Sequence, residues 1–252
     1  MSEVLTAQFW AGLMTIIWVN IILSGDNAVV IALAARSLPE RQQKQAVIWG
    51  AGAAVVLRIV LTIVAVELLK FPYLKIVGGL LLLWIAVKLL LPEDGGDDIQ
   101  GSDNLIQAIK TILIADLVMS LDNVIAVAAA AKGSIVLLVL GLLISIPLVV
   151  FGATLLMKLM ERFPIIITIG ATLIGWVAGE MLVTDPVLVE WIDANMSWMH
   201  VHLPLGLGDV TWGQIVGAVV VVVVGKWLAA RAEETGEEKS LDLVAKEQEQ
   251  PK

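Results

Sequence analysis

The segment ILSGDNAVVIA at residues 22–32 decides the fold, because it recurs as VMSLDNVIAVA at residues 118–128. A Ser, an Asp, an Asn and an Ala fall in register between the two copies at a shift of 96 residues. Farther along, Phe71-Pro72 and a following Gly, Trp, Ala and Leu match Phe163-Pro164 and its successors at a shift of 92 residues. Two matches in the same order indicate an internal duplication.

The composition predicts the class of protein that carries this duplication. Hydrophobic residues make up 59% of the chain and charged residues 16%. A membrane-spanning helix needs roughly 20 mostly apolar residues, and several blocks reach that length. We therefore predict an all-α polytopic membrane bundle of about seven transmembrane helices, at residues 9–35, 46–69, 72–91, 105–131, 135–158, 163–183 and 212–230.

The predicted helices divide the chain into two halves. Each half holds three spans, an odd number, so the second half should enter the membrane from the opposite side and form an inverted repeat. Transporters with inverted repeats bind their substrate near the membrane midplane, where the repeats meet. The expected segments are a first repeat at 9–91, an acidic linker at 92–104, a second repeat at 105–183, an extracytoplasmic loop at 184–211, a seventh helix at 212–232 and a charged, disordered tail at 233–252.

The distribution of charge predicts orientation. Short cytoplasmic loops are enriched in Lys and Arg. With seven spans, the basic residues at 36–44, 158–162 and 226–231 fall on one side, so we expect the N-terminus outside and the C-terminus in the cytoplasm of a bacterial plasma membrane. The net charge of −8 excludes a basic nucleic-acid surface, leaving the lipid bilayer as a partner; the oligomeric state is not predicted.

The repeated Ser-x-Asp-Asn motif carries the chemistry. Asp26 and Asp122 lie well inside apolar spans, where a charged side chain costs ~2.5–3.5 kcal/mol on insertion scales and is a functional candidate. Each is followed by an Asn, Asn27 or Asn123, whose amide oxygen is a neutral ligand for a hard cation.

Helix geometry predicts that this motif distorts its helix. In a regular helix the Asp lies about 160° away from the Ser two residues earlier. Either the helix breaks at 23–27, with the same expectation at 119–123, or the Asp faces another helix. A break would expose backbone carbonyls as cation ligands. The polar residues on one helix face are Asn20, Ser24 and Asn27 in the first copy and Asp116, Ser120 and Asn123 in the second.

Carboxylate, amide and hydroxyl oxygens together predict a site for a hard divalent cation. Such a site suits Mn²⁺, Mg²⁺ or Ca²⁺ better than Zn²⁺ or Cu⁺, which prefer the Cys and His that the predicted spans lack. The Ser hydroxyls have a second interpretation as small contact residues between helices. The candidate metal ligands are Asp26, Asn27, Asp116, Asp122 and Asn123, with Asn20, Ser24, Ser120, Arg58, Glu67 and Glu180 as possible additional site residues.

The paired motifs, with DLVMSLDN at 116–123 as the fuller copy, resemble the TerC family of integral membrane proteins. The resemblance covers nearly all of the chain through the seventh helix. It implies export of Mn²⁺ from the cytoplasm, with Asp26, Asn27, Asp116, Asp122 and Asn123 at the ion site. The chain departs from the family pattern at Asn20, where an acid is frequent.

Three function classes stay open from the sequence. The first is a secondary transporter, since the chain lacks a phosphate-binding Gly-x-x-x-x-Gly-Lys-Ser/Thr loop. The second is an intramembrane aspartyl protease that uses Asp26 and Asp122 as a dyad. The third is a metal-binding membrane subunit that does not transport. In addition, Arg58 lies within the second span and could pair with either motif Asp, while Glu67 and Glu180 lie near the predicted outer ends.

Overall fold

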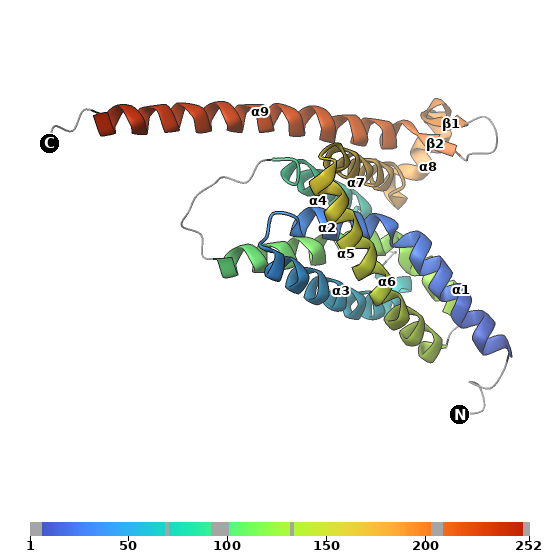
Figure 1. Ribbon diagram of the computed structural model, residues 1–252. Coiled ribbons are helices and arrows are strands. Elements are labelled where there is room, and N and C mark those ends of the chain that lie inside the picture. The colour runs from blue at the N-terminus through green and yellow to red at the C-terminus, as the bar shows by residue number, and fades with distance from the viewer. Residues whose placement is uncertain (1–6, 69–70, 92–100, 132–133, 203–208, 249–252) are drawn as a thin grey trace.

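A computed structural model describes residues 7–68, 71–91, 101–131, 134–202 and 209–248, which form a bundle of helices (Figure 1). The strands form one short antiparallel hairpin, and the other elements are helices. The predicted all-α class is therefore confirmed. The elements are α1 (Ala7–Leu23), α2 (Gly25–Ala35), α3 (Glu40–Leu68), α4 (Leu74–Lys88), α5 (Gly101–Ala131), α6 (Ile135–Arg162), α7 (Ile165–Val183), α8 (Pro186–Asn195), η2 (Ser197–Met199), β1 (His200–His202), β2 (Asp209–Thr211) and α9 (Trp212–Gln248).

The number of spans differs from the prediction of about seven. Among the described residues, five helices are long and apolar enough to cross a membrane, and α1 with α2 makes a sixth span if this bent pair is taken as one. Helix α4 has 15 residues, so it rises about 22 Å, less than the ~30 Å of bilayer hydrocarbon. Its apolar segment is longer, but Tyr73 has a left-handed backbone (φ 65°) that delays the helix start.

The first motif breaks its helix, as the sequence predicts. Helix α1 ends at Leu23, α2 begins at Gly25, and the two axes differ by 48°. The expectation of a break at 119–123 is wrong, because α5 continues through this segment without interruption. The difference between the copies follows from one position: Gly25 weakens a helix by about 1 kcal/mol relative to Ala, whereas Leu121 favours a helix and is buried.

The outer surface of the bundle is apolar. Large hydrophobic side chains are exposed on several helices, including Trp18 at 63%, Trp49 at 67% and Phe151 at 69%. Soluble proteins rarely expose so many large apolar groups over a continuous surface. This surface is suited to contact with lipid chains.

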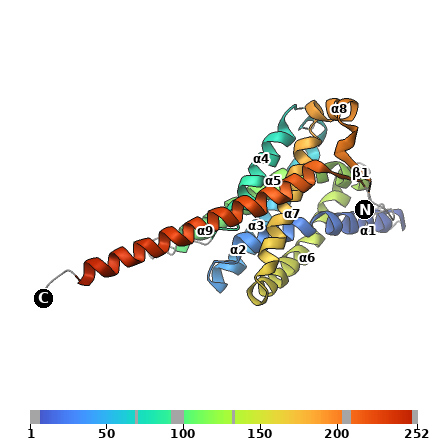
Figure 2. The same ribbon diagram turned by 90° about the horizontal axis from the view of Figure 1, so that it is seen from above.

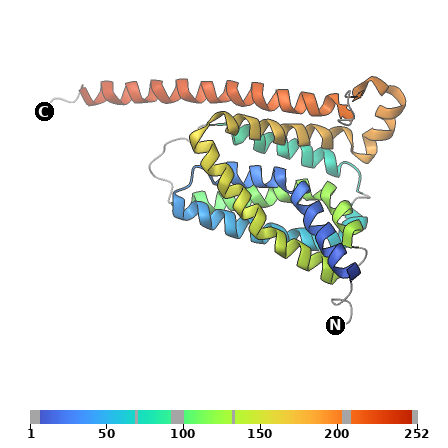
Figure 3. The same ribbon diagram turned by 45° about the vertical axis from the view of Figure 1, so that its right-hand side comes forward.

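Helix α9 covers one side of the bundle. Figures 1 and 3 show α9 along the outer side of α7 and α4, with α2, α3 and α5 beyond them. Seen from above, α9 also extends well past the bundle (Figure 2). Helix α9 continues to Gln248, through most of the segment 233–252 that the sequence analysis predicts as a charged, disordered tail. The described part of the predicted loop at 184–211 contains α8, η2 and the hairpin. Residues 92–100 of the predicted linker lie outside the described residues.

Glycines bring α7 and α9 into backbone contact. A Cβ atom on Gly179 would lie 2.0 Å from the carbonyl oxygen of Gly213, and one on Gly175 would lie 2.7 Å from that of Gly217. Both helices thus carry a Gly-x-x-x-Gly spacing at the contact, the pattern that permits close approach of membrane helices.

Asp185 ties the two halves together at one end of the bundle. Its side chain is fully buried and caps α8 by accepting the Val187 N–H at 2.9 Å. The same carboxylate accepts the N–H groups of Tyr73, Lys75 and Ile76 at the start of α4, at 3.1–3.3 Å. Helix N-termini leave such N–H groups without helical partners and favour negative charge. Asp185 therefore joins α4 to the turn between α7 and α8.

We predict that Gly179→Ala destabilises the protein, because the added methyl group forces α7 and α9 apart. The expected loss is about 1–3 kcal/mol, or roughly 2–12 °C in the thermal midpoint measured in detergent. Gly52→Ala is the matched control, because a Cβ atom there meets nothing within 4 Å. Equal midpoints for the two variants would contradict the close contact between α7 and α9.

Candidate functional site

The two motifs meet at the break between α1 and α2. A helix end leaves carbonyl groups without helical partners. Asn123, on α5, donates its side-chain Nδ2 to the Leu23 carbonyl at 3.0 Å. The second motif thus contacts the first at the point where the first helix is interrupted.

Arg58 is the centre of a buried polar network beside this break. It lies on α3, is 3% exposed, and makes four side-chain hydrogen bonds. Two go to the first half, from Nη1 to Asn20 Oδ1 at 2.9 Å and to Ser24 Oγ at 3.0 Å. The others go to α5, from Nε to Ser120 Oγ at 3.0 Å and from Nη2 to Asp116 Oδ1 at 2.6 Å.

The bond to Asp116 is a buried ion pair. The exposed fractions of the two side chains are 4% for Arg58 and 8% for Asp116. Ser120 Oγ also donates to Asp116 Oδ2 at 3.2 Å, so both carboxylate oxygens accept a hydrogen bond. From the sequence, Arg58 could pair with Asp26 or Asp122. In the structure its partner is Asp116 instead, because Asp116 lies on the face of α5 that meets α3.

The network extends to α6 through a residue that the sequence analysis missed. Asn20 donates its Nδ2 to the Ser145 hydroxyl, and Ser145 in turn donates to the Leu142 carbonyl at 2.7 Å. Ser145 is fully buried. A polar residue in the middle of the apolar block 135–158 was the signal available in the sequence.

Asn27 is the polar side chain of this region whose hydrogen-bonding capacity is unused. It is 3% exposed, and its Oδ1 and Nδ2 have no hydrogen-bond partner in the described part of the protein. Burial of an amide without partners is costly, so such a group calls for a ligand, ion or water. Asn27 is thus the residue of the motif best placed to gain from a bound species.

A small cavity lies against Asn27. Its volume is about 20 Å³, enough for one water-sized species. Besides Asn27, the polar wall contains Asn20, Ser24, Arg58, Asp116 and Ser145. The rest of the wall is aliphatic, including Ile31 and Val149. The cavity therefore collects oxygen atoms from both halves of the chain inside an apolar shell.

The remaining candidates lie beside the cavity or away from it. Asp26 is partly buried, lies within electrostatic range of Arg58 and Asp116, and accepts the Asn27 backbone N–H at 2.8 Å. Glu180 is exposed and accepts a hydrogen bond from Gln214 on α9 at 2.9 Å, so it belongs to the α7–α9 contact. The side chains of Asp122 and Glu67 lie outside the described residues.

The donor set fits a hard cation, although the carboxylates do not converge in this conformation. Within the described residues, no three Asp, Glu or His side chains gather as a metal cluster. Asp116, Asn20, Asn27, Ser24 and Ser145 offer carboxylate, amide and hydroxyl oxygens around one space. These are the ligand atoms that Mg²⁺, Ca²⁺ and Mn²⁺ prefer. Arg58 supplies the positive charge that balances Asp116.

Comparison with known proteins identifies the family. The model of the integral membrane protein TerC family matches residues 5–234. The uncharacterized membrane protein YjbE of Bacillus subtilis is 46% identical over 178 residues, which cover 71% of this chain and 82% of YjbE. The UPF0053 inner membrane protein YgdQ of Escherichia coli K12 is 26% identical over 174 residues, or 62% of this chain and 73% of YgdQ.

No solved structure matches the chain. A second protein of Bacillus subtilis, the uncharacterized membrane protein YceF, is 27% identical over 191 residues, which cover 71% of this chain and 74% of YceF. The family match includes every helix described above except the end of α9. This chain therefore belongs to the TerC family of integral membrane proteins.

Proposed function

We propose that this protein is a secondary membrane transporter that exports a divalent metal ion, Mn²⁺, from the cytoplasm. The observation that carries the proposal is the buried amide of Asn27, which has no partner among the described residues and borders a cavity lined with oxygen atoms. A polar side chain that is buried in a membrane bundle without a hydrogen-bond partner is costly, which makes it a candidate for function. Membership of the TerC family and the chemistry of the donor set support the same function.

The proposed ion site lies at the break between α1 and α2. Asn27 contributes its amide oxygen, and Asp116 contributes a carboxylate from the opposite half of the chain. Asn20, Ser24 and Ser145 line the same space. Asp26, Asp122 and Asn123 complete the set proposed from the motif, with Asp26 and Asn123 at the edge of the break. Mn²⁺ suits such oxygen ligands, and Mg²⁺ and Ca²⁺ share this preference.

Arg58 acts in this proposal as a tethered cation that alternates with the transported ion. In the described conformation its guanidinium neutralises Asp116 at 2.6 Å. A buried carboxylate without a counter-ion costs several kcal/mol. When the metal enters, the guanidinium moves away and the metal takes its place against the carboxylate. Asp116 then has a positive counter-ion in both states, which favours return of the empty transporter.

Metal flux separates transport from the alternative functions. An aspartyl protease or a metal-binding subunit would not move Mn²⁺ across the membrane. Purified protein in vesicles that contain a Mn²⁺-sensitive dye should admit Mn²⁺, and the assay should be repeated with Mg²⁺, Ca²⁺ and Zn²⁺, with and without a pH gradient. Vesicles whose Mn²⁺ uptake equals that of protein-free vesicles under every condition would exclude transport.

Asn27→Ala tests the role of the unpartnered amide. We expect Mn²⁺ flux to fall about tenfold or more, as for loss of a metal ligand or its direct support. Thermal stability should stay equal or rise, because the substitution removes a buried polar group that makes no side-chain hydrogen bond. Asn195→Ala makes the same chemical change on exposed α8 and should keep wild-type flux. Wild-type flux in Asn27→Ala, at equal protein amount, would remove the amide from the ion path.

A second pair of variants separates the structural role of the ion pair from its role in transport. Asp116→Asn leaves Arg58 buried without a carboxylate, so stability should fall by about 3–5 kcal/mol. The double variant Arg58→Met, Asp116→Leu replaces both charges with apolar groups and should recover much of that stability. We expect the double variant to fold, as judged by melting in detergent, and to transport no Mn²⁺. Wild-type transport by this variant would show that the pair serves the fold alone.

A further inference from the structure

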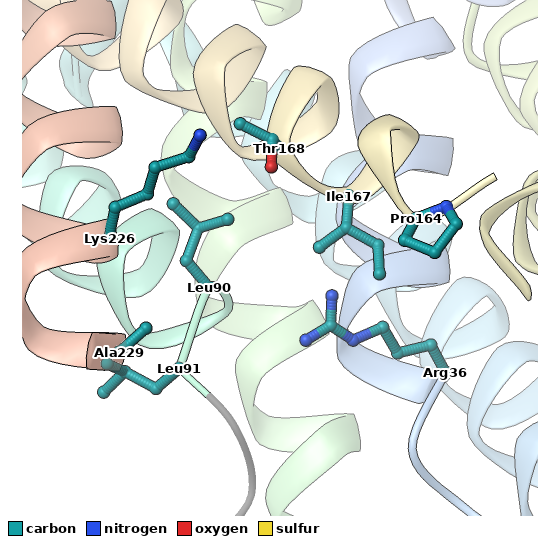
Figure 4. Close-up of a pocket in the computed structure, with 8 residues that line it drawn as sticks. All are labelled: Arg36, Leu90, Leu91, Pro164, Ile167, Thr168, Lys226 and Ala229. Carbon is teal, nitrogen blue, oxygen red and sulfur yellow. The ribbon is translucent and has the colours of Figure 1, made fainter. Parts of the chain in front are cut away.

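A second cavity lies at the other end of α4 from Asp185. Its volume is about 230 Å³, it is open on one side, and it is bordered by the C-terminal ends of α2 and α4, the first turn of α7, and α9 (Figure 4). The eight residues that line it are Arg36, Leu90, Leu91, Pro164, Ile167, Thr168, Lys226 and Ala229. The cavity thus brings together the two halves of the chain and α9.

The described lining of this cavity includes two cationic side chains. Arg36 and Lys226 line it, and none of its eight lining residues is acidic. In Figure 4 the Lys226 side chain extends from α9 toward Thr168, while the Arg36 guanidinium lies beside Ile167. A guanidinium and an ammonium group bind phosphate oxygens well. In a chain with a net charge of −8, a cavity lined by two cations and no acid is suited to an anion.

The walls of the cavity are held in place. Gln43 donates its Nε2 to the Arg36 carbonyl at 3.0 Å, which fixes the backbone at the end of α2. On the opposite side, a Cβ atom on Gly225 would lie 2.5 Å from Leu90 Cδ1, so α9 packs closely on α4 beside Lys226. The two cations therefore project from backbone segments with defined positions.

This end of the bundle has the residues of a membrane–water interface. Cations stack on aromatic rings there at 4.3–5.6 Å, in the pairs Lys88–Trp84, Arg162–Phe163 and Arg231–Trp227. Aromatic and basic side chains gather at the level of the lipid headgroups. The cavity also has aliphatic walls, from Leu90, Leu91, Ile167 and Ala229. A ligand with a phosphate and an apolar part fits both features.

We propose that this cavity binds the phosphate headgroup of an anionic phospholipid, with Arg36 and Lys226 on the phosphate and the aliphatic wall against the start of the acyl chains. Basic pockets between membrane helices bind such headgroups. The bound lipid would link α2 and α4 of the first half to α7 of the second and to α9. The site is separate from the cavity at Asn27 and does not depend on metal transport.

Native mass spectrometry of the full-length protein in detergent tests this proposal. Cardiolipin, phosphatidylglycerol and phosphatidylcholine are added separately, and the lipid-bound fraction is measured. We expect the two anionic lipids to bind wild-type protein more tightly than phosphatidylcholine does. The double variant Arg36→Gln, Lys226→Gln should lose about tenfold or more in affinity for them, since each juxtamembrane cation contributes measurably to anionic-lipid binding. Lys226→Arg should retain binding, because it preserves the charge.

The matched control is Arg41→Gln, Lys44→Gln, which removes two exposed cations near the start of α3 that do not line the cavity. An equal loss of affinity in this control would overturn the proposal in favour of general surface charge. Inorganic phosphate forms the last arm of the test. If millimolar phosphate raises the melting temperature of wild-type protein but not of the Arg36, Lys226 double variant, and the lipids bind both proteins equally, the cavity binds a soluble anion and the lipid proposal is wrong.

Discussion

Arg58 places a positive charge inside an apolar helix bundle, and the surrounding helices are arranged to accommodate that charge. An unpaired charge in this environment would cost several kcal/mol. The cost is met by Asp116 and Ser120 on α5, by Asn20 on α1 and by Ser24 at the break before α2. Helix α6 joins through Ser145. Because each partner comes from a fixed position on its helix, the charge sets how these helices align along their axes as well as which of them touch.

The break in the first span serves this arrangement and creates the candidate ion site. Ser24 stands between α1 and α2, so its hydroxyl can meet Arg58 while the following Asn27 faces the cavity. The exposed carbonyl of Leu23 is in turn satisfied by Asn123. Among the buried side chains at the break that the structure describes, the amide of Asn27 is the one without a hydrogen-bond partner. The hydrogen bonds of Arg58 hold the helices around the break in this conformation and leave the Asn27 amide facing the cavity.

The sequence predicted the helices and the break in the first span better than it predicted the side-chain contacts. The repeat located both motif segments, and Gly25 indicated the break that the structure contains. The partner of Arg58 depends on which face of α5 meets α3, and this is set by packing over the whole helix, so local spacing could not distinguish Asp116 from the motif acids. Leu121 keeps α5 helical where symmetry with the first copy suggested a break. The inverted relation of the halves, the orientation in the membrane and the choice of ion stay predictions. The glycines of α7 and α9 had a readable signal in their four-residue spacing, which the sequence analysis did not use.

The central claim is that a divalent ion binds at the break between α1 and α2, against Asn27 and Asp116. Anomalous X-ray diffraction at the manganese absorption edge, from crystals of the full-length protein grown with Mn²⁺, measures this directly. The account predicts an anomalous peak within ligand distance, about 2.0–2.6 Å, of the Asn27 amide oxygen, with the Arg58 guanidinium displaced from Asp116. Well-diffracting crystals whose anomalous peaks lie only at surface carboxylates, with the Arg58–Asp116 pair intact, would contradict it.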